Sequence, residues 1–185
     1  MKRFVAAHLG LMIVFVGSTA FAQAPPINEN LKCLKPLIGK WVTEITLEED
    51  SPGVGEAGET ISYTGIYKWT PNRNAVTLTV NANVGDQVIN ITNGLLVWDA
   101  ANKKILGLDA YVQGGIFQYE VHVHDDDILL VGHGANGEGA KTAMTVKYTD
   151  LSKDSITGQF IKRKEGDQEL PDLKPYKLTR VKKKS

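Results

Sequence analysis

The chain has 185 residues, and its 21 lysines and arginines balance 21 aspartates and glutamates, so the formal net charge is zero at neutral pH. Without a basic surplus, the composition argues against nucleic acid or an anionic surface as a partner. A chain of this length can bury a full core in one domain, and its single cysteine, Cys33, excludes an intramolecular disulfide. We expect the Cys33 thiol to be buried.

Residues 1–22 have the pattern of a secretory signal peptide. A basic start is followed by an apolar run over residues 9–16 and by a small-x-small cleavage pattern at residues 20–22. The apolar run is shorter than the roughly 20 residues that a membrane-spanning helix needs. The mature protein is therefore predicted to begin at Gln23, to be periplasmic or extracellular, and not to insert into the membrane.

Residues 23–40 are predicted to form an N-terminal segment that contains a short helix. Apolar residues recur there at the spacing of one helical face, and Asn28 or Asn30 can cap the start. The residue before a proline avoids helical geometry, so we expect the helix to end near Lys35, before Pro36. We interpret this segment as a lid helix, whose apolar face consists of Leu31, Leu34 and Ile38.

From Trp41 onward the hydrophobic period changes to two, which is typical of strands with one buried face. Turns rich in Gly, Asn, Asp and Pro separate these segments at short, regular intervals, and Asn93-Gly94 is interpreted as one of them. The predicted strands cover residues 41–47, 61–69, 76–81, 87–92, 95–98, 104–111, 116–124, 128–133, 142–148, 155–163 and 176–181.

A meander of this kind removes its exposed edges by closing on itself. We therefore predict an all-β fold, an antiparallel up-and-down β-barrel of about ten strands over residues 41–181, followed by a basic tail at residues 182–185. The second face of most predicted strands is polar, whereas an outer-membrane barrel would carry a continuous apolar band there.

Four short motifs occur in order along the chain: Gly39-Lys40-Trp41, Tyr67-Lys68-Trp69, the segment 94–99, and the segment 167–171. In their order and spacing, over roughly residues 31–181, the chain resembles a family of secreted bacterial calycin-like domains of unknown function. Its Gly-x-Trp opening is similar to that of lipocalins. The resemblance implies a lipocalin-like barrel with a central cavity and brings no catalytic residues.

The resemblance also implies how the barrel is closed. In lipocalins the tryptophan of the Gly-x-Trp motif often packs against an arginine near the barrel end. Gly39, Trp41 and Arg180 would have these roles here, with the Arg180 guanidinium over the indole ring. Haem-binding nitrobindin-like barrels share the opening but continue with a glycine-rich pattern. Here Val42-Thr43-Glu44 follows instead, which argues against haem.

Glu120, His122 and His124 lie two residues apart, so on a strand they project from one face. Histidines at this spacing can hold a metal, which makes an enzyme or a metal- or haem-binding barrel an alternative function. A two-residue turn at 125–126 would leave His133 on the same face but roughly 13 Å from His122, and a three-residue turn would put it on the other face. We therefore predict surface histidines and no metal site.

The aromatic residues are the strongest candidates for lining a cavity, with plain core packing as the alternative. Glycines inside predicted strands, at positions 65, 107 and 158, indicate either bends or room for a ligand. The candidate cavity residues are Trp41, Tyr63, Tyr67, Trp98, Tyr111, Phe117 and Phe160.

No Gly-x-Ser-x-Gly or similar nucleophile motif is present. We therefore expect a binding protein rather than an enzyme, with no cofactor and with a small apolar or amphipathic ligand in the barrel lumen. A structural or interaction domain with a filled core is the other alternative.

Overall fold

The computed structural model describes residues 25–182, so the predicted signal peptide and the last three residues of the basic tail lie outside the described range. Within it, one 3₁₀ helix, η1 (Glu29–Leu37), precedes eleven strands. No helix in this range is long and apolar enough to cross a membrane. The strands are β1 (Gly39–Thr46), β2 (Thr60–Trp69), β3 (Ala75–Val84), β4 (Gln87–Asp99), β5 (Lys104–Tyr111), β6 (Ile116–His124), β7 (Asp127–Ala135), β8 (Lys141–Thr149), β9 (Ser155–Glu165), β10 (Gln168–Leu170) and β11 (Tyr176–Arg180).

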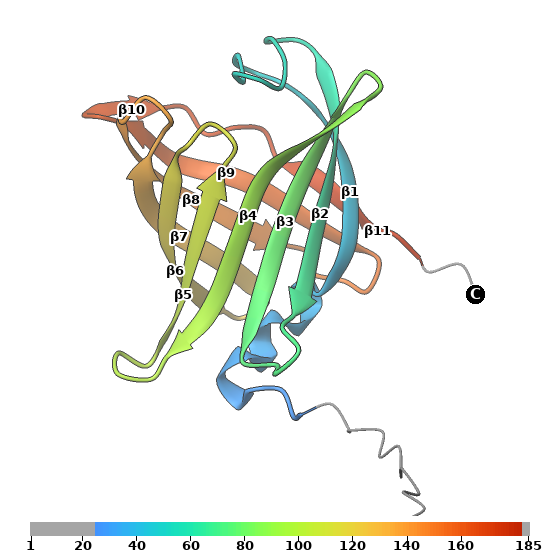
Figure 1. Ribbon diagram of the computed structural model, residues 1–185, viewed down its shortest axis with the longest axis vertical. Helices are drawn as coiled ribbons and strands as arrows, with labels where there is room; N and C mark the ends of the chain where they lie inside the picture. Colours follow the sequence, from blue (N-terminus) through green and yellow to red (C-terminus); the bar gives the residue numbers. More distant parts are fainter. Residues whose placement is uncertain (1–24, 183–185) are drawn as a thin grey trace, which may run out of the picture.

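The strands form a closed antiparallel barrel (Figure 1). Strands β1 to β9 pair with their neighbours in chain order, β9 pairs with β11, and β11 returns to β1. The short strand β10 pairs with the far end of β9 and lies outside this ring of ten. The predicted up-and-down barrel of about ten strands is confirmed.

One predicted turn is wrong. Asn93-Gly94 does not reverse the chain but lies inside the thirteen-residue strand β4. Gly94 pairs with Leu78 on one side and with Asp109 on the other. A Cβ at position 94 would collide with the Asp109 carboxylate. The glycine therefore serves the close approach of a neighbouring side chain, a role that its turn-like dipeptide conceals.

The N-terminal helix is also longer and tighter than predicted. It continues past Pro36 to Leu37 as a 3₁₀ helix, and Asn28 caps its start by accepting the Asn30 backbone N–H at 3.0 Å. Its buried residues are Leu31, Leu34 and Leu37, spaced by three. That spacing fits three residues per turn rather than 3.6, so burial of this face favours the tighter helix.

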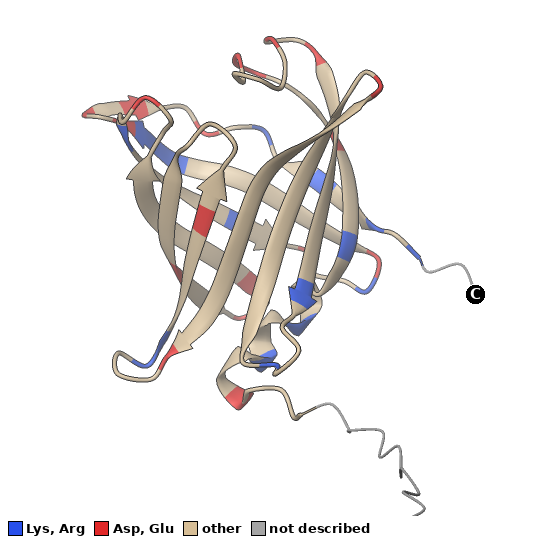
Figure 2. Cartoon of the chain, in the orientation of Figure 1, with Lys and Arg blue, Asp and Glu red and all other residues tan. Residues whose placement is uncertain are grey.

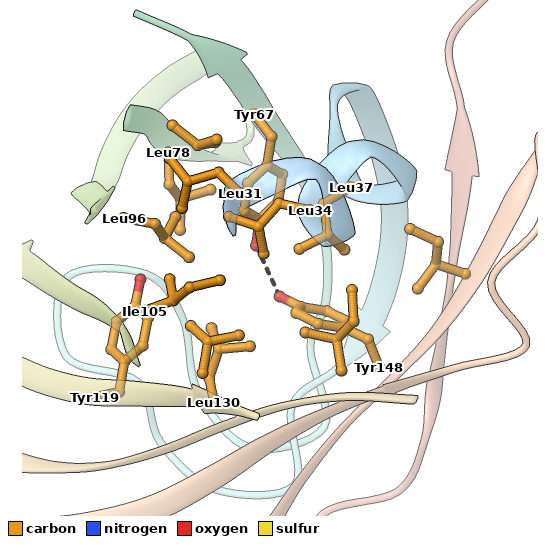
Figure 3. Packing of buried hydrophobic residues seen from close by; sticks show 14 of the residues in the cluster. Leu31, Leu34, Leu37, Tyr67, Leu78, Leu96, Ile105, Tyr119, Leu130 and Tyr148 are labelled. Carbon is orange, nitrogen blue, oxygen red and sulfur yellow. Dashed lines mark hydrogen bonds between the residues drawn. The ribbon is translucent and has the colours of Figure 1, made fainter. Parts of the chain in front are cut away.

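Helix η1 covers one end of the barrel, which we name the closed end, and its three leucines enter the main hydrophobic core (Figure 3). Trp41 is buried beside them and donates its indole N–H to the Leu37 carbonyl at 2.7 Å. The Arg180 guanidinium lies over the Trp41 ring at 3.9 Å, which is the contact that the resemblance implies. It also donates to the carbonyls of Pro36 and Ile38, so β11 holds the helix in place.

Candidate ligand site in the barrel lumen

Two tyrosines meet across the lumen. Tyr67 on β2 and Tyr148 on β8 point toward one another, and their hydroxyl oxygens are 2.9 Å apart (Figure 3). Both rings are buried, and burial raises the pKa of both phenols well above its usual value, so the bridge is a neutral hydrogen bond. The leucines of η1 pack into the same core as these rings, at the closed end.

A second polar pair lies on adjacent strands. Asp109 on β5 is only 7% exposed, and its Oδ1 accepts the Tyr119 hydroxyl of β6 at 3.0 Å. Burial raises the pKa of Asp109 to about 6, although the Tyr119 hydrogen bond acts in the opposite direction. The described residues offer no donor to the second carboxylate oxygen.

Inward-facing glycines make room for two of the tyrosine rings. A Cβ on Gly107 would collide with the Tyr119 ring, and a Cβ on Gly158 would lie 2.6 Å from the Tyr176 ring. Gly65 differs, because nothing lies within 4 Å of the place where its Cβ would be. The predicted strand glycines therefore hold tyrosine rings at two positions and leave open space at the third.

Thr43 adds a polar atom to the same side of β1 as Trp41, which pairs with Gly65. The residue is 7% exposed, and its Oγ1 has no hydrogen-bond partner. In the described part of the chain, it is the one solvent-inaccessible side-chain oxygen or nitrogen without a hydrogen-bond partner. A buried hydroxyl in this state costs free energy unless another molecule supplies the bond.

Several aromatic side chains that face inward beyond the tyrosine bridge are only partly buried, although Ile61, Ala82 and Phe117 at this end are fully buried. Phe160 and Tyr176 stack with ring centroids 5.8 Å apart and an interplanar angle of 30°. Tyr63 and Tyr111 are also incompletely buried, and burial raises the pKa of both phenols. We name this region, from the Tyr67–Tyr148 bridge to the barrel end opposite η1, the open half of the lumen.

Acidic loops surround the open half (Figure 2). The loops at this end are residues 47–59, 85–86, 112–115, 136–140, 166–167 and 171–175. They hold nine aspartates and glutamates but a single lysine, Lys174. The longest of them folds over the rim, where Val54 packs against Ile61 and Ala82.

The predicted cavity residues divide into two groups. Tyr63, Tyr67, Tyr111 and Phe160 lie at the bridge or in the open half. The others belong to the packed core instead: Trp41 and Phe117 are 1% and 3% exposed, and Trp98 packs against the same cluster. The inward aromatics therefore differ in how completely they are buried, and Phe117 is buried although it lies near the open end, which strand alternation alone does not reveal.

The alternative metal site has the predicted shared face but no metal-binding geometry. Glu120, His122 and His124 all project outward, with the two histidine side chains 51% and 82% exposed. Glu120 accepts Lys104 Nζ at 2.8 Å, and His133 pairs with Gln118 on the outer face. No group of three metal-ligating side chains occurs in the described residues.

The sequence interpretation missed Asp109, Thr43, Tyr119, Tyr148 and Tyr176 as site residues. A signal was present for Asp109, because it alternates with Gly107 and Tyr111 on what is otherwise an apolar face. A carboxylate at such a position is unusual enough to mark a site.

Comparison with known proteins supports the fold and leaves the function open. Neither a protein-family model nor a curated protein sequence matches the chain. Among solved structures, the chain is similar to the crystal structure of Rv2717c from M. tuberculosis, with a TM-score of 0.56 and 13% sequence identity over 85% of this chain and all of that one. At this identity the likeness shows a shared antiparallel β-barrel fold and nothing further.

Proposed function

We propose that the protein is an exported barrel that binds a small apolar or amphipathic molecule in the open half of its lumen. The observation that carries this proposal is the open space at Gly65, next to a strand on which the buried Thr43 hydroxyl has no partner. A lumen filled by its own side chains at this height would not leave the space at Gly65. The partly exposed aromatic walls supply the apolar surface that small-molecule sites use.

Filling this space tests the proposal. We expect the neutral fluorophore N-phenyl-1-naphthylamine to bind the wild-type protein saturably at one site, with a rise in its emission. Gly65→Leu places a side chain into the open space and should weaken this binding at least tenfold. Thr64→Leu, on the outward face of the same strand, is the matched control and should leave the affinity unchanged.

The opposite results would remove the lumen as the site. These are a wild-type protein that does not bind the fluorophore, or a Gly65→Leu variant that is folded by circular dichroism and binds as tightly as the wild type.

Export is supported by the N-terminal pattern and has its own test. Mass spectrometry of the protein from its host should give a mature N-terminus at Gln23 in the periplasmic or culture fraction. Recovery of the full-length chain from the cytoplasm would contradict it. The same sample, measured under native conditions, should carry a bound small molecule.

A further inference from the structure

Negative charge marks the open half of the lumen at two depths. Nine carboxylates lie on the loops at the open end, five of them between residues 47 and 59, which contain no basic residue. Deeper inside lies the Asp109 carboxylate, which points inward from β5. Glu48 and Glu49 form ion pairs with Lys174 and Arg163, but the loops themselves still hold more carboxylates than cations. A molecule that enters from this end meets this negative charge first and Asp109 next, and such a field concentrates cations.

The carboxylate of Asp109 has no counter-charge. Its one hydrogen-bond donor is the Tyr119 hydroxyl, and no lysine, arginine or histidine forms an ion pair with it among the described residues. Buried carboxylates in proteins are normally paired with a cation or fully hydrogen-bonded. Asp109 is more than nine-tenths buried and has only one such bond.

The second oxygen of this carboxylate, Oδ2, has no hydrogen bond in the described chain. Among the described side chains, Thr43 Oγ1 is the only solvent-inaccessible oxygen or nitrogen that lacks a hydrogen-bond partner, so Asp109 Oδ2, which also lacks one, is not completely inaccessible. Asp109 Oδ2 therefore keeps some accessible surface, and its strand position directs that surface into the lumen. The site can receive a positive group without displacing a protein donor.

Aromatic rings complete the surroundings of this oxygen. Tyr119 contacts Asp109 directly, and Tyr111 lies two residues away on the same face of β5. The hydroxyls of the Tyr67–Tyr148 bridge are near enough to interact electrostatically with the carboxylate. Aromatic faces attract organic cations, and the attraction is strongest where water is excluded.

The donor set favours an organic cation over a metal ion. A divalent metal needs several oxygen, nitrogen or sulfur ligands around one point, and no cluster of three metal-ligating side chains occurs in residues 25–182. A single carboxylate among neutral phenols and apolar walls matches a single positive charge on an apolar body.

We propose that the ligand of the open half is an amphipathic organic cation, an amine or quaternary ammonium group on an apolar body, whose charge lies against Asp109. This inference rests on the proposed lumen-binding function and specifies its ligand class. The acidic rim attracts the cation, the aromatic walls contact its apolar part, and Asp109 supplies the one charge inside.

Three molecules with the same ten-carbon chain test the proposal by isothermal titration calorimetry, below their micelle concentrations. Decyltrimethylammonium is a cation at every pH, decanol is neutral, and decanoate is an anion at pH 8. We expect the cation to bind at least tenfold more tightly than decanol at pH 8, and decanoate to bind most weakly. Asp109→Asn should remove the advantage of the cation and leave the decanol affinity unchanged. Asp126→Asn, in the exposed turn between β6 and β7, is the control and should change neither.

The affinity for the cation should also depend on pH. The ionisable groups near Asp109 are Tyr119 from β6, Tyr111 from β5, Tyr67 from β2 and Tyr148 from β8, and burial keeps all four phenols protonated. Asp109 is therefore the group that titrates inside the lumen between pH 5 and pH 8. Binding of decyltrimethylammonium should weaken about tenfold from pH 8 to pH 5, and this dependence should be absent in Asp109→Asn.

Each outcome separates the two proposals. If none of the three molecules binds, the lumen is not a site and the proposed function fails. If decanol or decanoate binds as tightly as the cation, the lumen remains a site and the inference about its ligand is wrong. If the cation binds preferentially but Asp109→Asn leaves its affinity unchanged, the charge does not lie against Asp109 and the inference is again wrong.

Discussion

The free energy of unfolding should fall as Asp109 ionises, and the Asp109→Asn substitution isolates this effect. The pKa of this carboxyl is about 6 in the folded chain, against 3.8 for the unperturbed group. Between these values the folded protein holds a proton that the unfolded chain has released. Stability from this proton is fully present below pH 3.8 and is lost as the pH rises through about 6.

The magnitude follows from the two pKa values. They differ by about two units, and each unit corresponds to ~1.4 kcal/mol, so the wild-type protein should lose about 3 kcal/mol through this group between pH 4 and pH 7. Asparagine has no charge to bury and keeps an oxygen that can accept the Tyr119 hydroxyl. The variant should therefore be about 3 kcal/mol more stable than the wild type at pH 8 and nearly equal to it at pH 4.

Urea titrations followed by tryptophan fluorescence at pH 4, 6 and 8 measure the difference between the two proteins. Taking the difference cancels the titration of the surface carboxylates, and Asp126→Asn should show no such pH dependence. A constant difference across the pH range would refute the reasoning, as would an Asp109→Asn variant that is less stable than the wild type at pH 8. The first result would mean that Asp109 is ionised and compensated in the ligand-free protein.

Three further substitutions probe the structure around the site, each measured as a change in the free energy of urea unfolding. Arg180→Ala should cost roughly 2–4 kcal/mol, because it removes the cation–π contact with Trp41 and leaves carbonyls of the η1 segment without a donor. Arg180→Lys should recover only part of this stability. A loss below about 1 kcal/mol for Arg180→Ala would contradict the role assigned to the Arg180 guanidinium. Gly107→Ala should cost roughly 1–3 kcal/mol, because the added methyl group displaces the Tyr119 ring. Gly65→Ala, whose methyl group meets open space, should be neutral or slightly stabilising. Equal changes in stability at both positions would argue against the packing described. Tyr67→Phe and Tyr148→Phe should each cost about 1–2 kcal/mol, because each leaves the other buried hydroxyl without its partner. The double variant should cost less than the sum of the two single variants. Strict additivity would mean that the two hydroxyls do not interact.

Strand alternation was sufficient to predict the barrel, because each strand buries one face and the side-chain period is two. It was also sufficient to place Glu120, His122 and His124 on a common face. Alternation alone does not say which face is the inner one, but the prediction that these are surface histidines is confirmed by their exposure. Local patterns failed where a distant partner decides the structure, as at Gly94, whose missing side chain makes room for Asp109 on the next strand.

The site itself was only partly predictable. The aromatic content of the inward face indicated a cavity, but the residues that divide it come from strands far apart in sequence: Tyr67 and Tyr148 are 81 positions apart. No local spacing relates such residues, since their meeting depends on how many strands close the ring. The helix was misassigned for a simpler reason, because a leucine spacing of three was interpreted with a period of 3.6.

The bridge between Tyr67 and Tyr148 lies between the leucines of η1 and the open half of the lumen. If the proposed ligand binds in the open half, it lies on the far side of this bridge from η1. The helix, which Trp41 and Arg180 hold in place, would then not need to move when the ligand enters or leaves. The ligand would pass only through the end opposite η1, and the two phenols, rather than the length of the strands, would set the depth of the site.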